Sequence, residues 1–168
     1  RIVRECGLHH EFVRTAELEH PEYRANPVNR CYHCKNELYG VLSSLAVARG
    51  ITSIFDGSNA DDRSDYRPGR KAAGDFGVRS PLDESDLTKS DIRELSRLAG
   101  LPTWDEPASA CLSSRIPYHS EVTGEKLRMI ELAETALRRL GFRVCRVRHH
   151  DTLARLEIGR DEMARALE

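Results

Sequence analysis

The sequence predicts an α/β domain followed by a small α+β lobe. Three observations support this fold class: an amphipathic segment at 27–50, the short apolar run ITSIF at 51–55, and an alternating apolar pattern at 142–158. A helix followed by a buried strand and a polar loop is the order found in open α/β sheets. We therefore expect residues 1–120 to form the α/β domain and residues 121–168 to form the lobe.

Local signals support each element in order. Asn26 is suited to cap a helix and Pro27 to its first turn, and apolar residues then recur at helical spacing until Gly50. The run at 51–55 is rich in β-branched residues, which favours a buried parallel strand. The other expected elements are helices at 90–99 and 123–140, strands at 142–150 and 153–158, and the start of a helix at 161–168.

The composition narrows the classes of function. The 168 residues carry 26 basic and 27 acidic side chains, a balance that gives no general attraction for nucleic acid. The sequence has no run of eighteen apolar residues and no signal peptide at its start, so we expect a cytoplasmic protein with no membrane span. Because the chain begins without Met in what reads as the middle of an element, we expect the natural protein to be longer.

Three of the five cysteines form a candidate metal site. Cys31 and Cys34 form a CxxC pair near the start of the first predicted helix, and Cys111 lies in a long loop rich in Pro and Ser. Three thiolates suit a [4Fe–4S] cluster with one open iron, or a zinc site with His33, His119 or another His as the fourth ligand. Spacing alone leaves the cluster, the zinc site and a redox or inert set of thiols equally open.

The polar loop DGSNADDRSDYRPGR directly follows the predicted strand at 51–55. Ligand sites in open α/β sheets form at the carboxyl ends of strands, and this loop offers acceptors for ribose or Mg²⁺ and arginines for phosphate. A solvated acidic turn would have the same composition. The candidate residues for nucleotide or Mg²⁺ are Asp56, Gly57, Asn59, Asp62, Asp65 and Arg67.

Two groups of polar residues further along the chain could bind an anion. Ser114 and Arg115 follow Cys111, where they could instead cap the next helix. Arg146 and Arg148 share one face of the first predicted strand, as Arg155 and Glu157 share a face of the second. A solvated outer face is the alternative interpretation for these four residues.

Four segments, in order, resemble the LarE family of ATP-dependent sulfur transferases, which belongs to the PP-loop ATP pyrophosphatases. They are NPVNRCYHCKNELY, FDGSNADDRSDYRPGRKAAGDFGVRSPL, PASACLSSRIPY and GFRVCRVRHHDTLARLEI. The resemblance extends over residues 20–160. It implies a Rossmann-like PP-loop domain of the adenine nucleotide alpha hydrolase type. The SGGxDS loop of that family is absent from these 168 residues, so we expect it upstream in the natural protein.

The resemblance also implies a reaction. ATP adenylates a carboxylate of pyridinium-3,5-biscarboxylic acid mononucleotide, and sulfur then displaces AMP, in the synthesis of the nickel-pincer nucleotide cofactor of lactate racemase. The cofactors implied are ATP, Mg²⁺ and a [4Fe–4S] cluster on Cys31, Cys34 and Cys111. The partners implied are the mononucleotide, a sulfide donor and further copies of the chain, in an oligomer such as a hexamer.

Residue by residue, the resemblance implies a site centred on Cys111. It assigns catalytic or substrate-phosphate roles to Ser114, Glu134, Arg146, Arg148 and Glu157, and we expect Arg115 to join the substrate-binding residues. Glu134 has no support of its own from the sequence pattern. The rival interpretations are a PP-loop tRNA thiolase, which would want a basic surface or an RNA-binding module, and a non-catalytic zinc-binding module.

Overall fold

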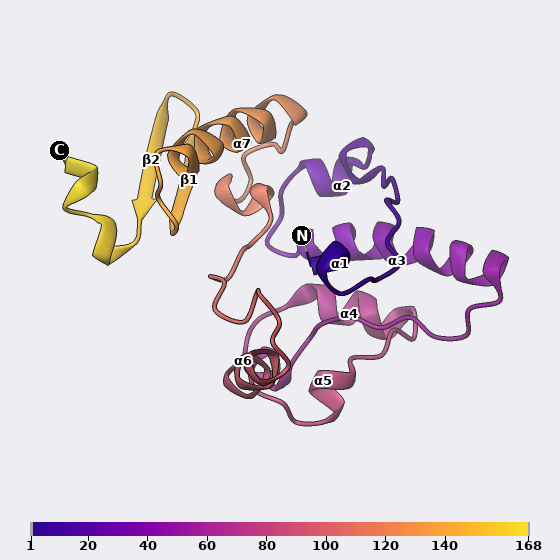
Figure 1. Cartoon of the computed structure of the whole chain (residues 1–168). Helices are drawn as coiled ribbons and strands as arrows, with labels where there is room; N and C mark the ends of the chain where they lie inside the picture. The colour runs from indigo at the N-terminus through magenta and orange to yellow at the C-terminus, as the bar shows by residue number, and fades with distance from the viewer. Residues whose placement is uncertain (1, 168) are drawn as a thin grey trace. The chain divides into compact units, whose positions relative to one another are not determined.

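The computed structural model describes residues 2–167, which divide into two compact units (Figure 1). Unit 1 contains the described residues up to Glu17 together with Asn29–Glu106. Unit 2 contains Leu18–Val28 and the described residues from Pro107 onward, so the boundary expected near residue 120 falls inside unit 2.

Unit 1 is mainly helical. Its helices are α1 (Ile2–Glu5), α3 (Arg30–Arg49), α4 (Pro68–Asp75), α5 (Pro81–Glu84) and α6 (Lys89–Leu98), with a 3₁₀ turn, η2, at Ala60–Arg63. The structure confirms the helices expected at 27–50 and 90–99, although α3 starts at Arg30 rather than at Pro27. Helix α3 ends at Gly50, whose left-handed φ of 65° is a conformation that glycine adopts without strain.

Helix α6 starts with a capping box. The Thr88 hydroxyl accepts a hydrogen bond from the Asp91 N–H at 3.2 Å, and the Asp91 carboxylate accepts one from the Thr88 N–H at 2.9 Å. Two backbone donors that the first turn leaves unpaired are satisfied in this way. Gly100, at a φ of 70°, follows the last turn.

Residues 51–55 do not form the buried strand that the sequence predicts. Only Phe55 pairs, in a single parallel bridge with Arg79, and the side chains of Ile51 and Phe55 are 50% and 57% exposed. No other strand of the described residues extends this pairing, so apolar side chains that a parallel sheet would bury remain open to solvent. The Rossmann-like α/β sheet therefore stays a prediction.

The core of unit 1 lies where α3 packs against α4. Tyr39 of α3 and Ala72 and Ala73 of α4 are buried, and the small alanines allow the two helices to approach closely. The ring of Phe76 lies 6.2 Å from the ring of Tyr39, within the range of favourable aromatic pairs. This contact holds the end of α4 against α3, and the candidate nucleotide loop leads into the start of the same helix.

Unit 2 contains one long helix, a β-hairpin and short turns. Its elements are α2 (Pro21–Arg24), the 3₁₀ turn η3 (Leu112–Arg115), α7 (Gly124–Arg139), β1 (Cys145–His150) and β2 (Leu153–Ile158). A further 3₁₀ turn, η1 (Glu17–Glu19), lies where the chain passes from unit 1 into unit 2. The helix expected at 123–140 and the two strands expected around a turn are confirmed, although β1 starts at Cys145 rather than at residue 142.

The hairpin separates an apolar face from a charged face. Cys145 and Val147 on β1 are buried, as is Ile130 on α7, the helix that packs against β1. Alternate residues of a strand point to opposite faces, so Arg146 and Arg148 lie on the other side. In the antiparallel register Arg146 faces Glu157 and Arg148 faces Arg155.

The segment that contains α2 packs against the loop that follows Cys111. Asn26 is fully buried and adopts a left-handed φ of 53°, which Asn tolerates better than most residues. Its amide donates to the carbonyls of Pro117 at 2.7 Å and Ser120 at 2.9 Å. The Tyr23 hydroxyl lies 2.6 Å from the Ser113 hydroxyl. These contacts fix the end of the Cys111 loop within unit 2.

The helix expected at 161–168 is not formed by the described residues. They make two 3₁₀ turns instead, η4 (Arg160–Glu162) and η5 (Arg165–Leu167), while residue 168 lies outside the described part. The Glu162 carboxylate accepts hydrogen bonds from the backbone N–H groups of Arg143 and Val144, both at 2.9 Å, which ties this segment to the start of β1.

No helix within residues 2–167 is long and apolar enough to cross a membrane.

Candidate functional site

The loop that carries Cys111 is fixed by Arg115, whose side chain is 4% exposed. Nη1 of Arg115 donates to the carbonyls of Ala110 at 3.0 Å and Cys111 at 3.2 Å and to the Ser114 hydroxyl at 2.9 Å. The Ser114 hydroxyl donates in turn to the Cys111 carbonyl at 2.7 Å. The backbone of the loop is therefore held in place while Cys111 itself is exposed.

Glu134 of α7 balances the charge of Arg115. Its side chain is fully buried, and Nε of Arg115 donates to Oε1 at 2.8 Å. Oε1 also accepts from the Val147 N–H at 3.2 Å, and Oε2 accepts from Arg138 at 2.8 Å. Burial alone would raise the pKa of Glu134, but the bonds from Arg115 and Val147 outweigh it and hold the pKa below the ordinary value. Glu134 is therefore an ionised carboxylate that joins α7, η3 and β1.

The charged face of the hairpin continues this group. Nε of Arg148 donates to Oε1 of Glu157 at 2.5 Å, and Nη2 of Arg155 donates to the same oxygen at 2.9 Å. Nη1 of Arg148 donates to the Ser114 carbonyl at 3.1 Å, which connects the hairpin to the Cys111 loop. The hydrogen bond from Arg148 is the main reason that the pKa of Glu157 lies below its ordinary value. Together with Arg146, this face carries three arginines but only one carboxylate, that of Glu157. The excess of positive charge suits an anionic ligand.

The structure brings together every residue that the sequence placed around Cys111. Hydrogen bonds link the loop, α7 and the charged face, and Nη2 of Arg146 reaches the carbonyl of residue 108 at 3.4 Å. The group consists of Cys111, Ser114, Arg115, Glu134, Arg146, Arg148 and Glu157. All of these residues belong to unit 2.

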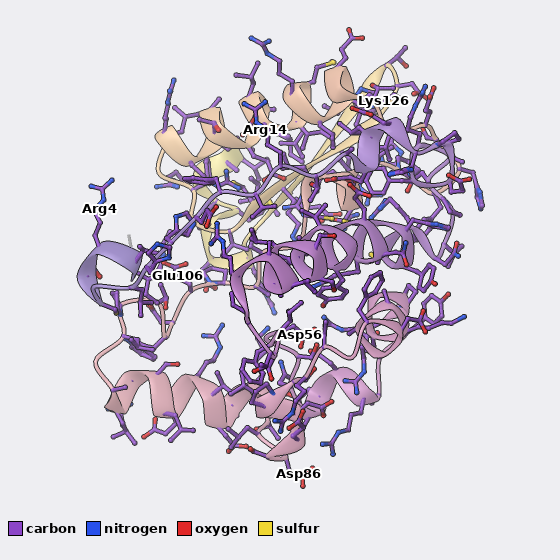
Figure 2. All side chains as sticks on the ribbon, turned by 90° about the vertical axis from the view of Figure 1, so that its right-hand side faces the viewer. Arg4, Arg14, Asp56, Asp86, Glu106 and Lys126 are labelled. Atoms are coloured by element: carbon purple, nitrogen blue, oxygen red, sulfur yellow. The ribbon has the colours of Figure 1, made fainter. Side chains whose placement is uncertain are left out.

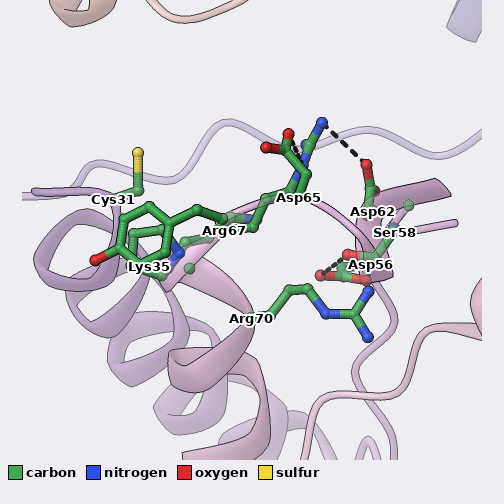
Figure 3. A pocket seen from close by; sticks show the side chains of 12 residues that line it. Cys31, Lys35, Asp56, Ser58, Asp62, Asp65, Arg67 and Arg70 are labelled. Atoms are coloured by element: carbon green, nitrogen blue, oxygen red, sulfur yellow. Dashed lines mark hydrogen bonds and ion pairs between the residues drawn. The ribbon is translucent and has the colours of Figure 1, made fainter. Parts of the chain in front are cut away.

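A separate cavity of about 470 Å³ lies in unit 1 (Figure 3). The loop that follows residues 51–55 forms most of its wall, and α3 adds Cys31 and Lys35. Five of the residues proposed for nucleotide or Mg²⁺ line this cavity: Asp56, Gly57, Asp62, Asp65 and Arg67. At Gly57 an added Cβ would meet no protein atom within 4 Å, so the space beside this residue is open.

Asp56 organises the wall of the unit 1 cavity. Oδ1 accepts hydrogen bonds from the Ser80 hydroxyl at 2.7 Å and the Ser58 N–H at 3.1 Å, and Oδ2 accepts from the hydroxyls of Ser58 and Tyr39, both at 3.0 Å. Burial would raise the pKa of Asp56, but these bonds outweigh it and lower the pKa. Figure 2 shows Asp56 among the helices of unit 1, whereas Asp86 projects from its edge.

Replacing Asp56 with Ala should destabilise unit 1 by about 1–3 kcal/mol, because the donors around it lose their acceptor. The lowered pKa means that this contribution is complete above the ordinary Asp value of 3.8 and is lost as the pH falls through the folded value. Denaturant titration at neutral pH measures the change. Asp65→Ala is the matched control, because Asp65 is 62% exposed and its loss should cost about 0.5 kcal/mol or less. Equal costs for the two variants would contradict the role given to Asp56.

Ion pairs shape the rest of this loop. Asp62 is buried, accepts a hydrogen bond from the Asn59 N–H at 3.1 Å and pairs with Nη2 of Arg67 at 2.9 Å. Nε of Arg67 also donates to Asp65 at 3.2 Å. The Asn59 side chain caps η2 by accepting from the N–H of residue 61 at 3.1 Å. Asn59 therefore shapes the loop without lining the cavity, and Arg67 faces two carboxylates of its own chain.

Sequence reasoning did not place Lys35 at the unit 1 cavity, whereas Arg70, which also lines it, is one of the loop arginines that the sequence offered for phosphate. Lys35 lies one helical turn after Cys31, a spacing that could have signalled a shared face, and its Nζ donates to the Tyr39 hydroxyl at 3.1 Å. Arg70 pairs with Asp83 at 2.7 Å, and its Nη1 is buried without a hydrogen-bond acceptor among the described residues. Figure 3 shows the guanidinium of Arg70 extending beneath Asp56.

The three candidate metal-binding cysteines are divided between the units. Cys31 and Cys34 lie in the first turns of α3 in unit 1, and Cys111 precedes η3 in unit 2. Cys31 and Cys111 are exposed, Cys34 is half-buried, and none of the three is in a disulfide. Within either unit, residues 2–167 bring no three His, Cys, Asp or Glu side chains together as a metal site.

No family model matches the chain. It is similar to an uncharacterized protein of Synechocystis sp., with 52% identity over 90% of this chain and 57% of that protein. It is also similar to the pyridinium-3,5-bisthiocarboxylic acid mononucleotide synthase of Lactiplantibacillus plantarum, with 35% identity over 94% of this chain and 57% of the synthase. An uncharacterized protein of Methanocaldococcus jannaschii is 32% identical over 81% of this chain and 53% of its own length. The chain thus spans about half the length of the curated relatives it matches, and over nearly all of its own length it is a distant homologue of the Lactiplantibacillus synthase.

Proposed function

We propose that the natural protein is an ATP-dependent sulfur transferase that thiolates the carboxylates of pyridinium-3,5-biscarboxylic acid mononucleotide for the nickel-pincer nucleotide cofactor. The observation that carries this proposal is the exposed Cys111 on a loop held by Arg115 and joined to the charged face through Ser114 and Arg148. The similarity to a synthase whose name gives the bisthiocarboxylic acid mononucleotide as its product supports the same reaction.

In this proposal ATP activates a carboxylate that is otherwise a poor target for a nucleophile. The carboxylate oxygen attacks the α-phosphorus of ATP and expels pyrophosphate, which gives an acyl adenylate. A sulfide sulfur then attacks the acyl carbon and AMP leaves, so one oxygen of the carboxylate is replaced by sulfur. Glu134 is a positioning residue in this scheme, because its oxygens hold Arg115, Arg138 and the Val147 N–H.

The unit 1 cavity is the proposed place for the nucleotide. Its volume of about 470 Å³ falls within the range of small-molecule pockets, and the open space beside Gly57 suits a close approach of ligand to backbone. Mg²⁺ prefers carboxylate oxygens. Asp65, which is 62% exposed, is the better candidate ligand, because each oxygen of Asp56 already accepts two hydrogen bonds.

Cys31, Cys34 and Cys111 are the residues proposed to hold a [4Fe–4S] cluster. Two exposed thiols and one half-buried thiol, none in a disulfide, fit the soft donor set that such a cluster needs. When bound, a cluster with one open iron would supply the sulfide that is transferred. The bonds from Arg115 and Ser114 to the Cys111 carbonyl would hold this third ligand in place. We also propose that the natural protein forms a homo-oligomer, such as a hexamer.

The mononucleotide phosphate is proposed to bind at Arg146 and Arg148. Replacing Arg148 with Gln removes a charge-assisted hydrogen bond, so affinity for the mononucleotide should fall by about tenfold to a hundredfold. Calorimetric titration of the full-length protein measures this change. Arg128→Gln removes the same charge from an exposed position on α7 and should leave the affinity within about twofold. If the Arg148 variant binds as tightly as the parent, this face is not the substrate site.

Adenylation provides a test of the proposed reaction class. The full-length protein, given Mg²⁺, ATP and sulfide, should release AMP and pyrophosphate in equal amounts only when the mononucleotide is added. Chromatography measures the AMP that is released with and without the mononucleotide. Release of AMP that depends on tRNA, and not on the mononucleotide, would support a tRNA thiolase and contradict the proposal.

A further inference from the structure

The outer edge of β2 has no strand beside it in the described part of the chain. Within residues 2–167, β2 pairs only with β1, in a two-stranded sheet. The Gly159 N–H donates to the Val144 carbonyl at 2.7 Å, just beyond the first pair of that register. Since the backbone groups of a strand point alternately to its two sides, the N–H and C=O groups of residues 154, 156 and 158 point away from β1. Among the described residues, β2 therefore leaves a row of donors and acceptors without strand partners.

The side chains of β2 are also largely uncovered. The first four residues of the strand, Leu153–Leu156, are exposed. Leu156 lies opposite the buried Val147 on the apolar face of the hairpin, yet it is 55% exposed, because α7 packs against β1. The segment after β2 does not return along this edge, since Arg165 stacks over the ring of Phe142 at 4.3 Å. An apolar side chain thus lies at the middle of an open sheet edge, a surface suited to pairing with another strand.

The sequence of β2 is complementary to itself in one register only. In an antiparallel pair, outward-pointing residues must face outward-pointing residues, so two copies can pair about a two-fold axis at residue 155, 156 or 157. An axis at Arg155 or at Glu157 would place that charge directly opposite its own copy, which is destabilising. An axis at Leu156 instead places Arg155 opposite the partner's Glu157 on both sides of the axis. The charges therefore select the register centred on Leu156.

We infer that β2 pairs antiparallel with β2 of a second copy of this chain, centred on Leu156. Residues 154, 156 and 158 of each copy then form about six backbone hydrogen bonds across the axis. The two leucines at position 156 cover each other on the apolar side, and Ala154 lies opposite the partner's Ile158. The open edge of each hairpin is in this way closed within a four-stranded sheet.

This pairing joins the charged faces of the two hairpins. A two-fold axis perpendicular to the sheet keeps both charged faces on the same side. Glu157, which accepts hydrogen bonds from Arg148 and Arg155 of its own chain, then also faces the partner's Arg155. Each copy thus adds a guanidinium group to the charged face of the other. The interface gives the proposed homo-oligomer one specific contact, and it does not depend on the sulfur-transfer reaction.

Cross-linking of the full-length protein tests the register. Leu156→Cys places two thiols opposite each other at a Cα–Cα distance of about 5.5 Å, which suits a disulfide. Mild oxidation should give a covalent dimer, and mass spectrometry of its peptides should find the bond between the two copies of residue 156. Leu153→Cys is the matched control, because Leu153 is also exposed but lies about 20 Å from its own copy in this register. Equal cross-linking through both positions, or none through residue 156, would overturn the inference.

Self-association provides a second readout. Arg155→Glu places carboxylates opposite each other on both sides of the axis, so the dissociation constant from sedimentation velocity should rise about tenfold or more. Adding Glu157→Arg to that variant restores opposite charges across the interface and should recover the association. Arg128→Glu makes the same charge change at an exposed position on α7 and should alter the constant about twofold or less. Weakening by Arg155→Glu that is no greater than that by Arg128→Glu would overturn the interface.

The interface and the proposed reaction can fail separately. A cross-link through residue 156 in a protein that makes no thiocarboxylate would leave the interface intact and overturn the proposed function. Thiocarboxylate formation by a protein that stays monomeric over the whole concentration series would overturn the interface and leave the reaction intact.

Discussion

Replacing Glu134 with Ala is expected to destabilise unit 2 by about 3–5 kcal/mol, the usual cost of leaving one partner of a buried ion pair without its counter-charge. Arg115 is 4% exposed and Glu134 fully buried, so water cannot replace the lost carboxylate. The same change leaves the Val147 N–H without its acceptor. Denaturant unfolding followed by far-UV circular dichroism measures the loss.

Glu157→Ala is the matched control, because it removes a carboxylate that is 35% exposed and should cost about 1 kcal/mol or less. The pH dependence provides a second check. Since the pKa of Glu134 is lowered in the folded chain, its contribution is complete above the ordinary value of 4.5 and is lost as the pH falls through the folded value. The Glu134→Ala variant should therefore lose less stability on acidification than the parent. Equal losses would contradict the ion-pair account.

Replacing Cys111 with Ala is expected to abolish sulfur transfer and the bound cluster while leaving unit 2 folded. Cys111 is exposed, and the contacts that fix its loop go to its carbonyl, which the substitution keeps. Iron and acid-labile sulfide should therefore disappear from anaerobically purified protein without a large change in unfolding free energy. Cys31→Ala and Cys34→Ala should have the same effect, because a cluster with three protein ligands depends on each of them.

Cys6→Ala is the matched control, since Cys6 is also exposed and has no assigned role in the site. It should retain both iron and activity. Zinc in place of iron, without labile sulfide, would support the zinc-binding alternative. Full cluster occupancy in the Cys111 variant would remove Cys111 from the ligand set.

The sequence predicted unit 2 better than unit 1 because its signals are local. The helix α7 shows its period within its own residues, and the strands of the hairpin alternate around a short turn. The alternation places Arg146 and Arg148 on one face, as the structure confirms through the register with β2. The prediction of a helix at 161–168 was wrong. Glu162 accepts hydrogen bonds from backbone groups about twenty residues earlier, and no local pattern reveals such a contact.

Glu134 shows where a sequence signal was available but was not used. It lies four residues after the buried Ile130, so both side chains point to the same side of α7. A carboxylate on the buried face of an amphipathic helix requires a charged or hydrogen-bonding partner. The sequence could therefore have predicted a buried partner for Glu134, although it could not have identified Arg115.

Unit 1 was harder to predict because its cavity depends on contacts between distant residues. Ser80 reaches Asp56 because the neighbouring residues Phe55 and Arg79 form the parallel bridge. The loop that the sequence proposed for a nucleotide or Mg²⁺ lines a cavity, but its composition did not indicate which side chains order the wall and which remain open to a ligand. The exposed Ile51 and Phe55 show that a β-branched, apolar run does not specify a buried strand by itself.

The most direct test of the central claim is the mass of the mononucleotide after turnover by the full-length, cluster-containing protein with ATP, Mg²⁺ and sulfide. The account predicts that carboxylate oxygens are replaced by sulfur, that more than one thiocarboxylate forms per chain, and that the protein keeps all five cysteines. Mass spectrometry measures the product and the protein in one sample. A mononucleotide that keeps all its oxygens while AMP accumulates would contradict sulfur transfer, and dehydroalanine at Cys111 in step with product would contradict transfer from sulfide.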